Sequence, residues 1–205
     1  MTHPIIEAIE ERRTTTLFDA DKQLADREIR ELVGWATRAP SSFNLQNWRF
    51  IAVQSAQAKA RLRPIAWDQP KVTEAAVTFI IVGVLADHEV LPARLAPAVQ
   101  AGIMPSEIAA AWAGAAKKLY HEQEWRARDE AVRSASLAAG HLIFAAHAMG
   151  LGAGPMIGFD ADAVSTEFGL APDEIPVLLL AVGHPKDVNW PQKPRRPLSE
   201  VIESV

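Results

Sequence analysis

The chain has 205 residues, 49% of them hydrophobic, a formal net charge of −4 at pH 7 and no cysteine. This length suits one domain, residues 1–205, and the apolar content excludes a disordered chain. The acidic balance argues against nucleic acid as a ligand, and the lack of cysteine excludes disulfides, thiolate catalysis and cysteine-ligated metals. The N-terminus has no apolar signal core, and the apolar run "VTFIIVGVL" is far shorter than the ~20 residues that cross a bilayer. We therefore expect a cytoplasmic protein.

The first elements along the chain are two helices and two strands. Pro4 favours the first turn of a helix that runs to about Arg13. A second helix is predicted from Asp26, a good N-cap, to about Ala39, because Pro40 follows. The alternating "WRFIAV" (48–53) and the continuously apolar "AVTFIIVGVL" (76–85) predict strands, and a short helix is expected between them.

The second half of the chain is more helical. Residues 86–105 have a weak pattern, so we expect little regular structure there, before a helix capped by Ser106 that reaches about Trp125. Residues 131–149 are apolar and alanine-rich on nearly all faces, which predicts a helix buried on several sides at the centre of the molecule. A short helix from Asp160, closed by Gly169, and a buried strand, "IPVLLLAVG", follow. The proline-rich tail (184–202) must run extended over a surface.

Familiar catalytic motifs are missing. "HEQEW" begins like a zinc motif, but Trp125 stands where the second histidine belongs. "GLGAGP" follows a helix instead of a strand and has the wrong glycine spacing for a dinucleotide-binding loop. No acid–base pair stands out, so we assign no catalytic or metal-binding side chain and expect the chemistry to belong to a cofactor.

Two small basic clusters lie near the ends of the chain, one at Arg12 and Arg13 and one at 193–196. Arginines at a helix C-terminus can simply complement its dipole, and the tail cluster can be an ordinary solvated charge run. Guanidinium groups can also grip a phosphate through paired hydrogen bonds. Cations near both ends of an otherwise acidic chain fit a bound dianion.

The segment "APSSFNLQNWRF" (39–50) is unusually rich in amides and hydroxyls for a connection between two buried elements. One interpretation is an elaborate turn whose side chains bond the backbone. That interpretation does not explain Gln46, whose place before a buried strand indicates a ligand-facing edge. Amides and hydroxyls together can meet the alternating donors and acceptors of a heterocycle.

Taken in order, "RRTTTLFD", "APSSFNLQNWRF", "GLGAGPMIGFD" and "KPRRPL" resemble the nitroreductase family of flavin enzymes. The resemblance covers residues 12–201. It implies an α+β sandwich with a central, mostly antiparallel sheet of four to five strands flanked by helices, in a homodimer that binds FMN. The implied reaction is ping-pong transfer of hydride from NAD(P)H through FMN to a nitroaromatic, quinone or similar acceptor. A flavin carrier or sensor with little turnover, and a flavin-fragmenting or reductively dehalogenating enzyme, remain as alternatives.

The resemblance also assigns roles to residues. Contacts on the phosphate side of FMN are implied for Arg12, Arg13, Thr14, Lys193 and Arg195. A loop reaching FMN from the partner subunit is implied for Pro40, Ser41, Ser42 and Asn44, with Gln46 near the ring. The resemblance implies that Asp68 and Lys71 contact the pyrimidine edge of the flavin. It also implies that the backbone of Pro155, Met156, Ile157 and Gly158 faces the flavin ring, with one N–H near the N5 atom.

Three positions depart from the family pattern. Thr16 stands where a basic residue is frequent, and Asn47 where proline usually precedes the tryptophan. Asp68 replaces the usual asparagine, so it can accept from the ring N3–H but cannot donate to a ring carbonyl. Lys71 can compensate, because a cation beside the ring stabilises the reduced flavin. In residues 86–125, the aromatic residues (Trp112, Tyr120 and Trp125) can be pocket walls or core.

Overall fold

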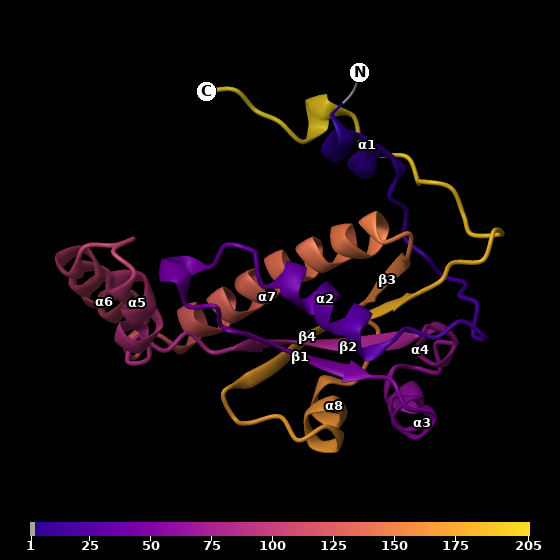
Figure 1. The fold of residues 1–205 in the computed structure, drawn as a ribbon, viewed down its shortest axis with the longest axis horizontal. Coiled ribbons are helices and arrows are strands. Elements are labelled where there is room, and N and C mark those ends of the chain that lie inside the picture. Colours follow the sequence, from indigo (N-terminus) through magenta and orange to yellow (C-terminus); the bar gives the residue numbers. More distant parts are fainter. Residues whose placement is uncertain (1–2) are drawn as a thin grey trace.

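The computed structural model describes residues 3–205 and has a four-stranded sheet between two layers of helices (Figure 1). The strands are β1 (Trp48–Val53), β2 (Val77–Val84), β3 (Gly152–Met156) and β4 (Glu174–Gly183). The α-helices are α1 (Pro4–Glu11), α2 (Asp26–Ala36), α3 (Ala56–Ile65), α4 (Lys71–Glu74), α5 (Leu91–Gln100), α6 (Ser106–Tyr120), α7 (Glu124–Ala148) and α8 (Ala161–Glu167). Two 3-10 turns are η1 (Ser42–Asn44) and η2 (Leu198–Glu200).

The sheet has the order β1-β2-β4-β3, and every neighbouring pair is antiparallel. Strand β2 is buried along almost its whole length, as its continuous apolar run predicted. The α+β fold with an antiparallel sheet of four strands is therefore confirmed. The sequence did not predict β3 as a strand, because glycine and proline hide its extended conformation. Pro155 is tolerated there because β3 lies at the edge of the sheet.

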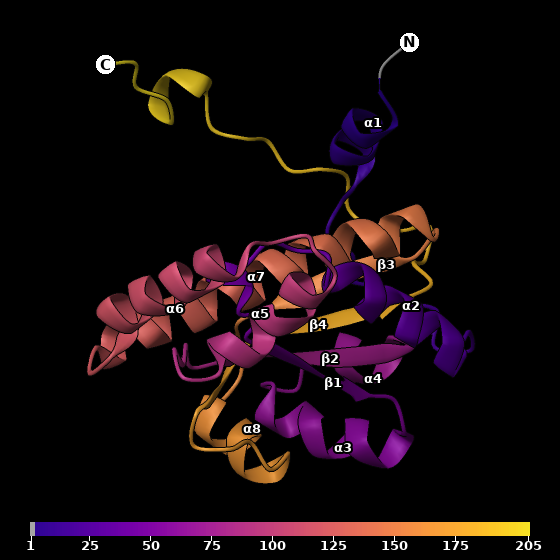
Figure 2. The same cartoon turned by 60° about the vertical axis from the view of Figure 1, so that its left-hand side comes forward.

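The helices cover both faces of the sheet (Figure 2). Helices α2 and α7 bury Leu32 and Leu142 against one face. Helices α3 and α8 bury Leu62 and Val164 against the other face. Helix α7 crosses β2 so closely that a Cβ on Gly83 would lie 2.6 Å from the Ala131 carbonyl O. Glycine at this crossing lets the longest helix approach the centre of the sheet.

The prediction of little regular structure at 86–105 is wrong, because α5 forms there. Leu91 and Leu95 are buried together with Leu45 and Ala116 in a small core separate from the sheet. Their spacing of four residues places them on one helix face. Two prolines in the helix concealed this pattern.

Helices α6 and α7 have different bounds from those predicted. Pro105 is extended and acts as the cap, so Ser106 is the first residue of α6. Helix α6 ends at Tyr120, before Trp125, and α7 begins at Glu124. The prediction that α7 is buried on several sides is not met within one chain, since Leu137 and Phe144 are 43% and 39% exposed.

Helix α1 and the tail after β4 extend beyond the main body (Figures 1 and 2). Helix α1 has no buried residue, and its isoleucines are exposed. The tail is extended up to η2, as its prolines predicted, but it leaves the main body instead of running over a surface of the same chain. In the described part of the chain, no helix combines the length and apolar character needed to span a membrane.

Candidate functional site

The site is built on the outer edge of β3, which pairs with the segment that follows α1. The Thr15 N–H donates to the Ala153 carbonyl at 2.9 Å, and Thr14 forms a parallel bridge with Ala153. A Cβ on Gly152 would lie 2.4 Å from Thr15 Oγ1, and one on Gly154 would lie 2.4 Å from Thr15 O. These two glycines are required because the 13–16 segment occupies the space of their side chains.

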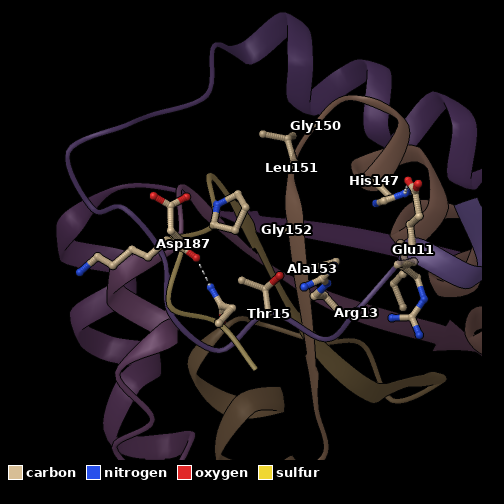
Figure 3. Close-up of a pocket in the computed structure, with 14 residues that line it drawn as sticks. Glu11, Arg13, Thr15, His147, Gly150, Leu151, Gly152, Ala153 and Asp187 are labelled. Atoms are coloured by element: carbon tan, nitrogen blue, oxygen red, sulfur yellow. Dashed lines mark hydrogen bonds and ion pairs between the residues drawn. The ribbon is translucent and has the colours of Figure 1, made fainter. Parts of the chain in front are cut away.

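The larger hollow at this edge has a volume of about 430 Å³ (Figure 3). Arg12 and Arg13 line it together with the start of β3 and the first residues of the tail. It also contains carboxylates. Figure 3 shows Glu11 with His147, 4.0 Å from its carboxylate, on one side of β3 and Asp187 on the other. The hollow therefore has mixed charge.

A smaller hollow of about 100 Å³ lies beside the same segment and carries a different set of groups. Thr14, Lys193 and Arg195 line it, and no carboxylate does. Neither cation forms an ion pair with any residue in 3–205. The Gln192 Nε2 donates to the Arg12 carbonyl at 3.1 Å and ties the tail to the end of the first helix. The structure thus brings together the two basic clusters from opposite ends of the sequence.

The tail is held in place by Asn189, a residue that sequence reasoning missed. Its Oδ1 accepts hydrogen bonds from the backbone N–H groups of Thr16, at 2.8 Å, and Leu17, at 3.0 Å. Its Nδ2 donates to the carbonyls of Leu17 and Lys186, both at 2.8 Å. A single asparagine among prolines does not form a recognisable motif, so these four hydrogen bonds are identified only from the structure.

Lys71 reaches β3 from the start of α4. Its Cδ lies 3.6 Å from the position that a Cβ on Gly154 would occupy. Burial lowers the pKa of the Lys71 amine, because the charged form is removed from water. The Asp68 side chain, in contrast, points outward. It is 81% exposed, and its Oδ1 lies 3.9 Å from the Arg63 Nε.

The segment Pro155–Gly158 leaves the end of β3 and passes near the turn that precedes α4. The Met156 side chain is buried, whereas Ile157 is 84% exposed. Among residues 3–205 the Ile157 N–H has no hydrogen-bond partner, although the carbonyl of Gly158 accepts from Gln69 Nε2 at 2.8 Å. The chain thus presents the Ile157 N–H as a free backbone donor at this point.

The polar loop that contains Pro40, Ser41, Ser42, Asn44 and Gln46 is internally ordered. Ser41 Oγ accepts from the Gln46 N–H at 2.9 Å, and Ser42 Oγ lies 2.7 Å from the Tyr120 hydroxyl. Phe43, Asn44 and Gln46 have φ values of 50°, 59° and 50°. The Ser41 hydroxyl therefore fixes the loop's own left-handed backbone, as the turn interpretation expected, while the Ser42 hydroxyl ties the loop to α6.

The structure does not bring this loop to the site in its own chain. The loop enters β1 at Trp48, which pairs with Gly83 near the end of β2. Ala153 pairs with Val182, which in turn pairs with Val77 at the start of β2. The two ends of β2 are about 20 Å apart at about 3.4 Å per residue. The loop and the start of β3 therefore lie at opposite ends of the sheet within one chain.

Comparisons with known proteins agree with this geometry. The family model described as "Nitroreductase family" matches residues 9–184. The chain is 31% identical to YodC of Bacillus subtilis (strain 168), provisionally named an NAD(P)H nitroreductase, over 96% of each chain. It is 33% identical to the NADH dehydrogenase of Thermus thermophilus, over 85% of this chain and 83% of that one. A structure from Exiguobacterium sibiricum, solved in complex with FMN, superposes with a TM-score of 0.91 at 26% identity, over 100% of this chain and 99% of the other.

Proposed function

This chain belongs to the nitroreductase family, and we propose that it is an FMN-dependent oxidoreductase that passes electrons from NAD(P)H to a nitroaromatic, quinone or similar acceptor. The observation that carries the proposal is the set of donors beside β3, from the tail cations, which form no ion pair within residues 3–205, to the free Ile157 N–H. When bound, FMN supplies the redox chemistry, accepting hydride from the nicotinamide and then reducing the acceptor.

The smaller hollow fits the phosphate of FMN. Lys193 and Arg195 provide charge and Thr14 provides a hydroxyl, with no carboxylate among the lining residues. The larger hollow is the poorer place for a dianion because it contains Glu11 and Asp187, although its two arginines border the same segment. Charge-assisted hydrogen bonds of this kind are the strong ones in phosphate recognition.

The far end of β3 fits the ring of FMN. From Gly152 to Gly158 an extended chain spans at most about 20 Å, which leaves room for a mononucleotide to lie along it. Lys71 would place a positive charge beside the ring and favour its reduced state. The Ile157 N–H would donate a hydrogen bond to the ring, and Asp68 would have to turn inward to meet the pyrimidine edge.

We further propose that residues 1–205 act as one domain in a homodimer, with each site completed by the partner's polar loop. Exposed apolar surface supports this: an open groove of about 510 Å³ is lined by Trp35, Phe144 and Met149. The isoleucines of α1 and the apolar residues of η2 are exposed as well. Obligate interfaces are large and apolar.

Light scattering tests the dimer directly. We expect a mass twice the 22.3 kDa of one chain at every concentration at which FMN stays bound. A monomer that retains FMN would contradict the proposal that the partner's loop completes the site.

Steady-state and transient kinetics test the reaction. We expect the purified protein to release FMN, and not FAD, on denaturation. We also expect NADH or NADPH to bleach the flavin absorbance under anaerobic conditions without any acceptor. With a quinone as the second substrate, parallel initial-rate lines are expected, because the nicotinamide and the acceptor would use the same face of the ring. Intersecting lines would contradict the ping-pong scheme.

Removing Lys193 from the smaller hollow, or Arg13 from the segment that the hollow borders, is expected to weaken FMN binding. Lys193→Ala and Arg13→Ala should each raise the Kd for FMN by roughly 10- to 150-fold, or about 1.5–3 kcal/mol, the usual range for a hydrogen bond to a charged group. The matched control is Arg196→Ala, because Arg196 lies in the same tail but is paired with Glu200 at 3.0 Å. A wild-type Kd in Lys193→Ala would remove that residue from the phosphate site.

Removing the charge of Lys71 should affect electron transfer more than binding. Lys71→Met is expected to slow flavin reduction by NADH about tenfold or more, and to raise the Kd for FMN by less, since the positive charge matters most once the ring is reduced. The reduction potential of the bound flavin should fall in the same variant. Stopped-flow absorbance and a redox titration measure the two effects, and an unchanged reduction rate would refute the role given to Lys71.

A further inference from the structure

The tail carries its two cations to the smaller hollow on a length of chain that is not packed into the core. Asn189 is half-buried, whereas every residue after it, 190–205, is exposed. Burial of apolar side chains therefore does not fix the place of Lys193. Ordering an exposed chain costs conformational entropy, so a cation on it binds an anion more tightly when other contacts already hold the chain.

The Asn189 amide makes most of those contacts. Its Oδ1 accepts from the backbone N–H groups of Thr16 and Leu17 and also from the Thr16 hydroxyl, at 3.2 Å, while its Nδ2 donates to the Leu17 carbonyl. Within residues 3–205, the other hydrogen bond from this part of the tail to the main body is that of Gln192 to the Arg12 carbonyl. Asparagine is needed because one of its atoms must accept and the other must donate, which aspartate cannot do.

The next residue, Trp190, supports Lys193. The Lys193 Nζ lies 5.5 Å from the centroid of the Trp190 ring, which is within the range of a cation–π contact. Trp190, Lys193 and Arg195 all line the smaller hollow. Because Trp190 follows Asn189 directly, the amide that fixes residue 189 also fixes the start of the chain on which the ring and the amine lie.

We propose that Asn189 and Trp190 are positioning residues that give the site its preference for a flavin with a terminal phosphate. Asn189 holds the tail against the main body, and Trp190 sets the place of the Lys193 amine. The proposal rests on the proposed function, because it takes the smaller hollow as the phosphate site. The donors at the other end of β3, Lys71 and the Ile157 N–H, do not depend on the tail. Riboflavin, which lacks the phosphate, should therefore bind independently of both positioning residues.

The test compares the Kd values of the full chain for FMN and for riboflavin, from titrations followed by flavin fluorescence. Asn189→Leu keeps the size of the side chain and removes its hydrogen bonds, so it is expected to raise the Kd for FMN about tenfold and the Kd for riboflavin less than twofold. Trp190→Leu should raise the Kd for FMN about threefold, and Trp190→Phe, which keeps a ring beside the amine, should restore most of the affinity. The matched control is Val188→Ala, whose side chain is 71% exposed and which should leave both Kd values unchanged.

A double-mutant cycle separates positioning from a general loss of stability. If Asn189 acts through Lys193, Asn189→Leu should raise the Kd for FMN less than threefold in a chain that already carries Lys193→Ala. An unchanged Kd for FMN in Asn189→Leu, or equal losses for FMN and riboflavin, would overturn the inference and leave the proposed function intact. If Asn189→Leu does not fold, the same two outcomes in Trp190→Leu decide. A wild-type protein that binds neither flavin would overturn both the inference and the proposed function.

Discussion

Proline at position 157 is expected to slow reduction of bound FMN by NADH at least a hundredfold, whereas Ile157→Ala should stay within about threefold of wild type. The Ile157 side chain is 84% exposed, so little packing is lost on truncation. Proline removes the free N–H, and loss of one preorganised donor at a reacting group costs roughly 10²–10³ in rate. Met156 lies in β3 and is already extended, as a residue before proline should be, so the fold is expected to survive.

Anaerobic stopped-flow absorbance measures this effect, and thermal unfolding and FMN titration serve as controls on the same preparations. A melting temperature close to wild type together with a slow reduction would assign the effect to the missing donor. Reduction of Ile157→Pro at the wild-type rate would show that the backbone at this position does not assist the reaction.

Alanine at Gly154 is expected to disrupt the site and destabilise the fold. Its Cβ would lie 2.4 Å from the Thr15 carbonyl O, and a backbone atom cannot rotate away as a side chain can. The segment that bears the phosphate contacts must then separate from β3, with loss of the hydrogen bond from Thr15 to Ala153. We expect the free energy of unfolding to fall by about 2–3 kcal/mol, as in other overpacked sites, and FMN affinity to fall more than a hundredfold.

Gly152 provides the matched control for this variant. The three atoms nearest to a Cβ there all belong to the Thr15 side chain, with Oγ1 at 2.4 Å. Adding Thr15→Gly should therefore rescue Gly152→Ala but not Gly154→Ala, in both chemical denaturation and FMN titration. Equal rescue of the two would show that β3 and its neighbouring segment adjust together and that the close approach to Thr15 O is not the cause.

The elements that the sequence predicted well are those whose pattern is local. The apolar run of β2 and the cap of α8 at Asp160 each depend on residues close in sequence, and both formed as expected. Strand β3 and helix α5 were missed because proline and glycine changed their local preference, and packing against distant residues overrode it. Propensity alone does not contain that information.

The same distinction holds for the site. Motifs along the chain identified the basic clusters and Lys71, and the fold brings them to one edge of the sheet. Two features depend on contacts between distant segments: the hydrogen bonds of Asn189 to the segment after α1, and the contact of the Trp67 ring with Gly158. No spacing within the sequence predicts such contacts, so Asn189 and Trp67 were overlooked.

The polar loop and the phosphate hollow lie at opposite ends of the sheet in one chain, and in the proposed homodimer this has a genetic consequence. Each site would take its loop from one copy and its cations from the other. A chain defective in the loop and a chain defective in Lys193, expressed together, would form mixed dimers in which one site carries both defects and the other carries none. Two inactive alleles would then restore activity in the same cell, up to half that of a wild-type dimer for each mixed pair.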